Sequence, residues 1–180
     1  GYYNNSSGES NSALGYSNYA YGDASSALGY KNNTNGNSSS AVGNDNYAYG
    51  EASNALGNCN YANGNYSSAL GAGNSANGFS SSAVGYCSIA NSDSSSAVGY
   101  YNYTSSANSL SVGYSNNYDL DSWTPADNGE NSTAVGYNNY SSGNNSSAVG
   151  YNNYSSGESS NAMGYYNNSS GESNSALGYS

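Results

Sequence analysis

One spacing constrains this chain more than any other feature: a short motif returns every fourteen residues. The motif is Ala-(Leu/Val/Met)-Gly, with Ser111-Val112-Gly113 as the one variant. Its copies end at Gly15, Gly29, Gly43, Gly57, Gly71, Gly85, Gly99, Gly113, Gly136, Gly150, Gly164 and Gly178. Every interval is 14 residues except the one from Gly113 to Gly136, which is 23. Fixed periodicity of this kind indicates a repeat architecture.

The composition fits a repeat better than a globule or a disordered tract. Of 180 residues, 42 are Ser, 34 Asn, 24 Gly and 23 Tyr, and charged residues make up only 7%. Val, Ile, Leu and Met number 15, too few for a globular core, and twelve of them directly precede the repeat glycines. A disordered polar tract would not hold one aliphatic residue in phase.

Charge and residue types exclude several functions. The chain has one Lys, no Arg, no His and a net charge of −10. Nucleic-acid binding needs basic residues at phosphates, and catalysis commonly needs His or an anion clamp. We therefore expect no enzyme activity, no cofactor, no metal and no nucleic-acid partner. No apolar run could span a membrane, and no signal-peptide pattern is present, which indicates a processed chain or a piece of a longer one.

Within a repeat, residues are numbered 1 to 14, ending at the motif glycine; residues 16–29 are a typical copy. Each half reads (Ser/Asn)-x-Ala-x-Gly-x-x, which is a short strand followed by a turn in which glycine supplies positive φ. The sequence thus predicts an all-β fold, a parallel β-solenoid (β-roll) of about twelve 14-residue rungs. Residues 1–113 and 129–180 form rungs, and residues 114–128 form a surface loop that interrupts one rung.

Strand parity places the small residues at positions 10, 12 and 14 inside a narrow coil and the aliphatic residue at position 13 outside. The opposite arrangement would place Tyr and Asn from positions 4 and 6 inside, where they pack badly. A stacked column of exposed aliphatic side chains marks an interface, so we expect a symmetric oligomer. Its predicted seam consists of Leu14, Leu28, Val42, Leu56, Leu70, Val84, Val98, Val112, Val135, Val149, Met163 and Leu177.

The stretch from Ala13 to Gly29, ALGYSNYAYGDASSALG, resembles the YadA-like head repeats of trimeric autotransporter adhesins. Their pattern is small-x-Ala-(Ile/Val/Leu)-Gly-x-x-small-x-Ala-x-Gly, and the match covers the chain apart from 114–128. The resemblance implies a left-handed β-roll, a homotrimer formed through the aliphatic column, and display at a cell surface for adhesion. The chain departs from the pattern in its abundant Tyr, its nearly constant Asn at position 3 and the lack of a stalk or anchor segment, so the secretion route is not indicated.

Two side-chain columns are predicted from the rung spacing. Asn at position 3 forms an amide ladder, and Tyr at position 1 forms an aromatic one that is interrupted at Asn44, Asn58 and Ala72. The tyrosines either cover and stiffen the roll or form an adhesive, sugar-stacking surface.

Thirteen Asn-x-Ser/Thr sequences are candidate N-glycosylation sites in a secreted protein. Those at position 3 face inward and are expected to stay bare. The outward candidates for covalent glycans are Asn5, Asn37, Asn65, Asn131, Asn144, Asn145 and Asn168.

Other polar residues suggest weaker sites. Seven of the 11 acids fall at position 8, where a solvated edge is favoured over calcium binding. The interruption carries candidate contacts for calcium or a partner, namely Asp119, Asp121, Trp123 and Asp127. Cys59 and Cys87 lie two rungs apart, roughly 9–10 Å, which is too far for an intrachain disulfide.

Residues 1–17 are identical to residues 164–180, which indicates a longer 163-residue super-repeat and end-to-end continuation of a fibre. The favoured function is a structural, adhesin-like extracellular fibre segment at a cell surface. The alternatives are a module that binds glycans or host and surface polysaccharides, and a viral tail-fibre segment.

Overall fold

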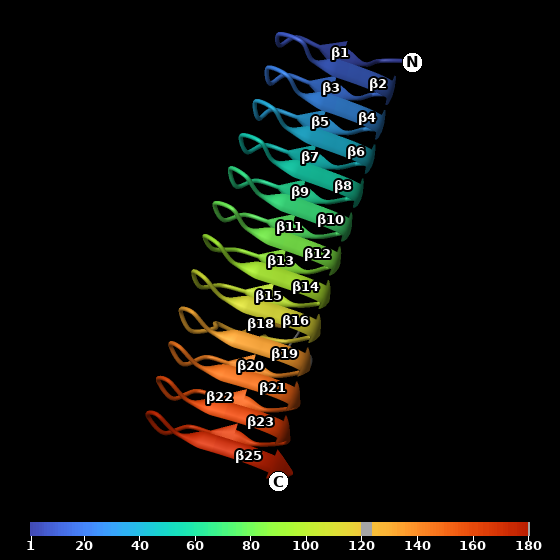
Figure 1. The fold of residues 1–180 in the computed structure, drawn as a ribbon. Helices are drawn as coiled ribbons and strands as arrows, with labels where there is room; N and C mark the ends of the chain where they lie inside the picture. The colour runs from blue at the N-terminus through green and yellow to red at the C-terminus, as the bar shows by residue number, and fades with distance from the viewer. Residues whose placement is uncertain (120–123, 180) are drawn as a thin grey trace. The chain divides into compact units, whose positions relative to one another are not determined.

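The computed structural model describes residues 1–119 and 124–179. Each repeat forms one turn of a coil, called a rung here, with one five-residue strand and, outside the interrupted rung, one two-residue strand (Figure 1). The long strand covers positions 11 to 14 and position 1 of the next repeat, and the short strand covers positions 4 and 5. This arrangement confirms the predicted all-β parallel β-solenoid of about twelve rungs. The described residues contain no helix.

Contacts divide the chain into two units, Gly1–Cys87 and Ser88–Ser180. The long strands of the first unit are β2 (Ser12–Tyr16), β4 (Ser26–Tyr30), β6 (Ser40–Asn44), β8 (Asn54–Asn58), β10 (Ser68–Ala72) and β12 (Ser82–Tyr86). Those of the second unit are β14 (Ser96–Tyr100), β16 (Leu110–Tyr114), β19 (Thr133–Tyr137), β21 (Ser147–Tyr151), β23 (Asn161–Tyr165) and β25 (Ser175–Tyr179). Within each unit they pair in parallel and in this order.

The short strands stack beside the long ones. In the first unit they are β1 (Asn5–Ser6), β3 (Tyr19–Ala20), β5 (Asn33–Thr34), β7 (Tyr47–Ala48), β9 (Tyr61–Ala62) and β11 (Ser75–Ala76). In the second they are β13 (Ile89–Ala90), β15 (Tyr103–Thr104), β20 (Tyr140–Ser141), β22 (Tyr154–Ser155) and β24 (Asn168–Ser169). An antiparallel pair, β17 (Tyr118–Asp119) and β18 (Thr124–Pro125), belongs to the interruption, which lies inside the second unit.

Equal positions of successive repeats lie side by side. Leu14 pairs with Leu28 in the first unit, and Val112 pairs with Val135 across the interruption in the second. The insertion therefore leaves the register of the long strands unchanged. This register turns every sequence position into a column of like side chains.

The interior of each unit is narrow and contains only small side chains. Ala at positions 5 and 12, Ser at position 10 and Asn at position 3 are almost fully buried, as Ala20, Ser25, Ala27 and Asn32 show. Among the described residues, the largest fully buried side chains are Asn and Thr. The parity prediction is thus confirmed: small residues face inward and the aliphatic column faces outward.

The buried asparagines form the predicted amide ladder. Asn46 Nδ2 lies 3.0 Å from Asn32 Oδ1 and also donates to the carbonyls of Val42 (3.0 Å) and Gly57 (2.8 Å). Its own Oδ1 accepts from Asn60 N and Nδ2 at 3.1 and 3.0 Å. Each amide thus links three rungs and also donates to backbone carbonyls at the corner of the coil.

The turns correct one expectation. In the turn after position 14, glycine does take positive φ, as in Gly29 at 123°, and position 2 follows at about 55°, as in Lys31. In the other turn, the positive φ falls at position 9, as in Ser38, and not at the glycine of position 7. Residues at positions 2 and 9 are never β-branched, in keeping with the crowding of the left-handed region.

Glycine at position 7, which all repeats carry except those with Ser92 and Ser106, is favoured by close approach instead. A Cβ built on Gly36 would lie 1.9 Å from the carbonyl oxygen of Gly50 in the next rung. The residues with positive φ at positions 2 and 9 direct their backbone N–H groups toward the preceding rung. Ser38 N donates to Asp23 O at 2.8 Å, and Lys31 N donates to Tyr16 O at 3.0 Å. The rung-to-rung hydrogen bonding therefore continues through the corners.

We predict that Asn46→Ala lowers the free energy of unfolding by about 2–4 kcal/mol, because it leaves several buried amide groups without partners. Chemical denaturation followed by circular dichroism measures this loss. The matched control is Asn35→Ala, an exposed residue of the preceding repeat, which should change stability by less than about 0.5 kcal/mol. Equal stability of the two variants would contradict the role of the ladder.

Candidate functional site

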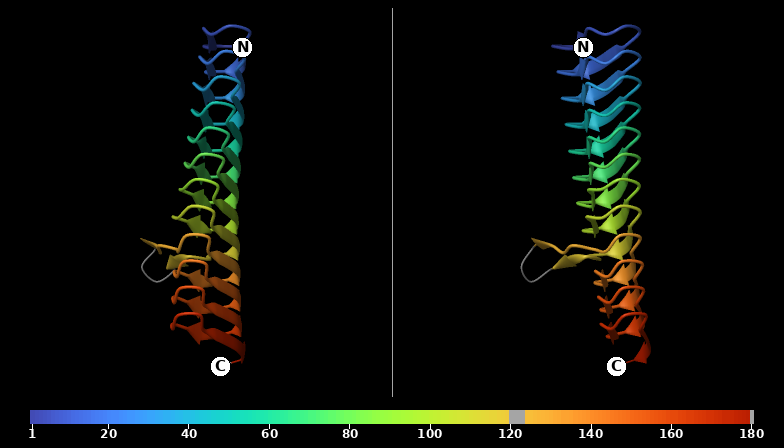
Figure 2. Two further views of the ribbon diagram at one scale, coloured as in Figure 1. Left: turned by 60° about the vertical axis from the view of Figure 1, so that its left-hand side comes forward. Right: turned by 90° about the vertical axis from the view of Figure 1, so that its left-hand side faces the viewer.

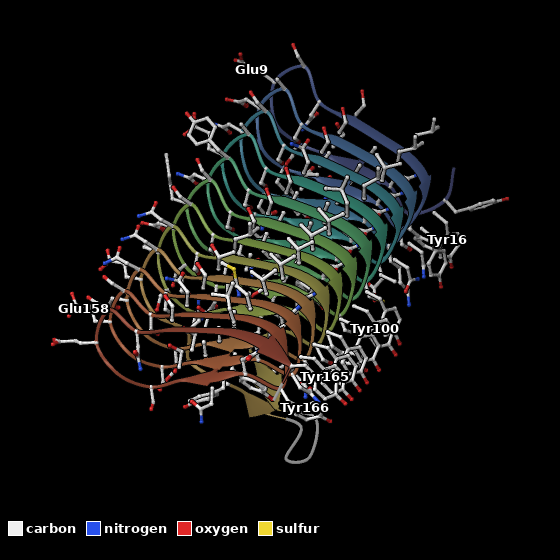
Figure 3. All side chains as sticks on the ribbon, turned by 60° about the horizontal axis from the view of Figure 1, so that its bottom comes forward. Glu9, Tyr16, Tyr100, Glu158, Tyr165 and Tyr166 are labelled. Carbon is white, nitrogen blue, oxygen red and sulfur yellow. The ribbon has the colours of Figure 1, made fainter. Side chains whose placement is uncertain are left out.

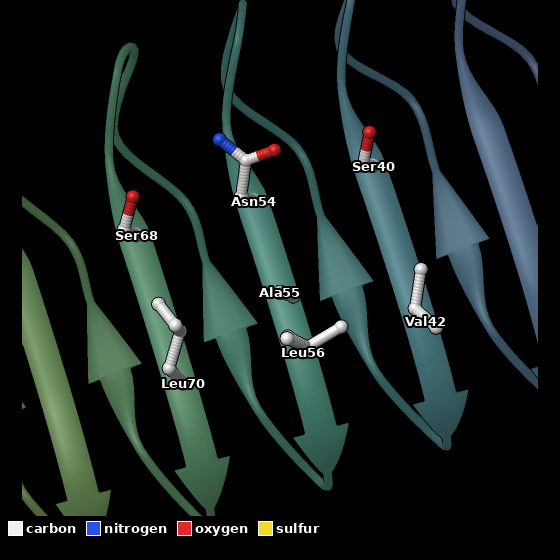
Figure 4. A pocket seen from close by; sticks show the side chains of 7 residues that line it. All are labelled: Ser40, Val42, Asn54, Ala55, Leu56, Ser68 and Leu70. Atoms are coloured by element: carbon white, nitrogen blue, oxygen red, sulfur yellow. The ribbon is translucent and has the colours of Figure 1, made fainter.

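The position-13 side chains form an outward aliphatic column on the long strands of each unit. In the first unit it consists of Leu14, Leu28, Val42, Leu56, Leu70 and Val84. Leu28 and Leu56 are 44% and 46% exposed, which is unusual for leucine in a strand. Figure 4 shows Val42, Leu56 and Leu70 projecting from the same face of neighbouring strands. They line a shallow groove of about 310 Å³ together with the position-11 residues Ser40, Asn54 and Ser68.

The second unit presents the same column. It consists of Val98, Val112, Val135, Val149, Met163 and Leu177. The four valines are half-buried by their neighbours, whereas Met163 is 38% exposed. The structure thus brings all twelve predicted seam residues into in-register outer columns, six in each unit.

The tyrosines of position 1 stack along a different edge of the coil. In the second unit, successive rings from Tyr100 to Tyr179 lie parallel, with centroids 4.8–5.0 Å apart and interplanar angles of 2–12°. In the first unit, Tyr16 and Tyr30 stack at 5.4 Å. Figure 3 shows that Tyr16 lies at the turn opposite Glu9, and Tyr165 at the turn opposite Glu158.

This stacking decides what the tyrosine column can do. Because each ring covers the face of the next, a sugar or a peptide can reach only the ring edges and hydroxyl groups along its length. Mutual stacking stabilises the outer edge of the coil, and aromatic pairs contribute about 0.5–1.5 kcal/mol each beyond buried area. The geometry favours the covering role over a continuous sugar-stacking surface.

The acids of position 8 lie at the opposite turn. There Asp and Asn side chains accept hydrogen bonds from the preceding rung: Glu9 N donates to Asp23 Oδ1 at 2.8 Å, and Asp23 N to Asn37 Oδ1 at 3.0 Å. Within the described part of the chain, no three His, Cys, Asp or Glu residues are grouped so as to hold a metal ion.

The interruption projects from the side of its rung as the β17–β18 hairpin (Figure 2). Two buried asparagines, which the sequence analysis did not single out, close its base. Asn117 has φ 53°, accepts from Ala126 N at 3.0 Å, and turns its side chain inward, where Oδ1 accepts from Ser141 N at 2.9 Å. Asn128 Oδ1 accepts from Ser105 Oγ at 2.8 Å, and its Nδ2 donates to Ser132 Oγ at 2.9 Å.

The predicted loop contacts are only partly described. Asp127 is exposed beside this base. Asp121 and Trp123 lie outside the described residues, and the side chain of Asp119 does as well.

The candidate glycosylation residues fall in two groups. The seven outward candidates are all exposed, whereas the position-3 asparagines are buried, except for half-buried Asn4. At Asn37 and Asn144, Oδ1 accepts a hydrogen bond from a backbone N–H of the preceding rung, at 3.0 and 2.9 Å.

Cys59 and Cys87 are free, half-buried thiols. Burial, with Asp45 adding to it, raises the pKa of the Cys59 thiol.

A mixed aromatic and polar cluster lies on the short-strand side of the first unit, and the sequence analysis missed it. Tyr47 donates a 2.9 Å hydrogen bond from Oη to Asp45 Oδ1. This bond raises the pKa of Tyr47 from its ordinary value of 10.0 to about 12, with burial and the negative charge of Asp45 acting in the same direction. The neutral phenol is favoured because its ionisation would place two negative charges side by side.

We predict that Asp45→Ala lowers the pKa of Tyr47 back toward its ordinary value. Titration of the ring carbons by NMR, with Tyr47 assigned, measures this change. Glu51→Ala removes an acid that does not contact Tyr47 and should leave its pKa unchanged. A Tyr47 that titrates normally in the unmodified chain would refute the hydrogen bond.

The fold and its outward aliphatic column define a β-solenoid repeat protein whose rungs expose apolar side chains in register. A family model described as "YadA head domain repeat (2 copies)" matches residues 6–32, 20–46, 62–86, 76–102 and 128–153. These matches cover more than half of the sequence, and the chain belongs to the YadA head domain repeat family. The family is a structural adhesin repeat, found in surface-exposed adhesins. No curated protein matches the sequence.

Residues 1–119 and 124–179 contain no helix that is long and apolar enough to cross a membrane.

Proposed function

We propose that this chain is a structural segment of an extracellular adhesin fibre and that three copies associate through their aliphatic columns. The observation that carries this proposal is that the aliphatic side chains at position 13, such as Leu28 and Leu56, are exposed to solvent and lie in register along the long strands. Water contact along such a column is unfavourable, and burying each side chain contributes roughly 1.5–3 kcal/mol. Heads of this family form trimers, which supports the stoichiometry.

The aliphatic column, the tyrosine column and the acidic turn each support a structural role in a fibre. The aliphatic column is flanked at position 11 by Ser, Asn or Thr, with Leu110 as the exception, which gives a largely polar margin to an apolar interface. The tyrosine column stiffens one edge, and the acids at position 8 oppose lateral pairing of strands at the other. The identity of residues 1–17 with 164–180 supports continuation of the same coil in a 163-residue super-repeat.

We predict that the unmodified chain has the mass of three chains in solution and that Leu28→Ser combined with Leu56→Ser shifts it to monomer. Both side chains point away from the core, so the circular dichroism spectrum should remain that of a β-solenoid. Native mass spectrometry or light scattering measures the mass. Tyr154→Ser, an exposed substitution on the short strands, should leave the trimer intact. An unmodified chain that is monomeric or dimeric would overturn the proposal.

We also propose that glycans attach only at the exposed sequons. In chain isolated from its native source, enzymatic release of N-glycans in ¹⁸O-water should convert some of the seven exposed asparagines to labelled Asp. Mass spectrometry should find buried Asn32 and Asn139 unchanged, because their amide groups are held inside the ladder. Label at these two residues, or none at the seven, would contradict the assignment.

A further inference from the structure

A second groove, of about 270 Å³, lies in the first unit on the side that carries the short strands. It is lined by positions 2 and 4 of three successive rungs, namely Ser17, Tyr19, Lys31, Asn33, Asp45 and Tyr47. The aliphatic column lies on the long strands, so the proposed trimer seam does not use these residues. The groove therefore stands independently of the proposed function.

The two walls of this groove are aromatic. Tyr47 stacks on Tyr61 with a centroid distance of 4.8 Å and an interplanar angle of 5°, so one of its faces is covered. The other face turns toward the rung of Asn33, where the position-4 side chain is too short to stack. Tyr19 lies on the far side of that rung. With rungs roughly 4.8 Å apart, the two tyrosines are separated by about 9–10 Å.

This separation selects a ligand of a certain thickness. Carbon atoms in contact lie about 3.5–4.0 Å apart, so a flat ring between the two walls accounts for only about 7–8 Å. A puckered pyranose ring fills the remaining space and directs C–H groups at the negative faces of the tyrosines. In the tyrosine column of position 1, by contrast, no such slot exists where the rings stack at 4.8–5.0 Å.

The polar groups of the groove suit a ligand rich in hydroxyl groups. Asp45 holds the ring of Tyr47 through the 2.9 Å hydrogen bond and retains acceptor capacity. Lys31 supplies donors, with its ammonium 5.2 Å from the centroid of Tyr30. Asn33 Oδ1 is buried without a hydrogen-bond partner among the described residues. Since no bond holds this oxygen, rotation about the soft χ2 torsion presents the amide to a ligand at little cost.

We propose that this groove binds one hexopyranose unit of a polysaccharide. The sugar ring stacks against Tyr47 and Tyr19, and its hydroxyl or amide N–H groups donate to Asn33 and Asp45. The chain then holds a glycan-binding site on a face that trimer formation leaves open.

The test uses the 180-residue chain and two probes, the trisaccharides of N-acetylglucosamine and of glucose. We expect saturation-transfer NMR to detect binding of at least one, and calorimetry to give its affinity. Tyr47→Ala should weaken this binding by about tenfold or more, the scale of one lost aromatic contact. Tyr154→Ala is the matched control, because it removes an exposed tyrosine of the same repeat position outside the groove, and should have no effect.

Two further variants keep the proposal testable if Tyr47→Ala fails to fold. Asn33→Tyr completes a stacked column from Tyr19 to Tyr47, so it should fold stably and abolish binding. Asn33→Ala should weaken binding, whereas Asn152→Ala should not, although Asn152 Oδ1 is also buried without a partner among the described residues.

Binding of neither trisaccharide, or binding that Asn33→Tyr leaves unchanged, would overturn the proposal. Native mass spectrometry of the same samples separates this result from the trimer. A lost sugar site with an intact trimer, or the reverse, assigns the failure to one proposal only.

Discussion

Hydrogen bonding between successive rungs is the interaction on which the rest of the structure depends. It extends through strands and corners, and the position-3 asparagines carry it into the interior, where Asn32, Asn46 and Asn60 bond to one another and to corner carbonyls. A core built this way needs identical geometry at each turn more than it needs apolar area. That requirement explains a chain rich in Ser, Asn and Gly that still folds.

Because the core uses only small side chains, the large ones lie outside and form columns with separate chemistries. Aliphatic side chains follow the long strands, stacked tyrosines follow one turn and acids follow the other. Exact repetition gives a column its stiffness, as in the stack from Tyr100 to Tyr179. A departure from repetition, such as Asn33 between Tyr19 and Tyr47, leaves a groove lined by both aromatic and polar side chains.

The sequence was sufficient to predict the period, the strand parity, the outward position of Leu28 and its equivalents, and the amide ladder. Each follows from the spacing of single residues. It was insufficient at position 9, because a left-handed Ser38 leaves only the indirect signal that β-branched residues are missing. It also missed Asn117 and the groove at Asn33. Their roles depend on neighbours one or more rungs away, and in this composition one asparagine looks like any other.

The base of the interruption has a consequence for how such coils diversify. Asn117 and Asn128 replace the missing inner contacts, so Val112 still pairs with Val135 although nine extra residues leave the rung between them. The coil therefore accommodates an insertion within one rung, and a pair of asparagines holds the base of that insertion in place. Evolution, or a protein engineer, can exchange what a rung displays without redesigning the scaffold that displays it.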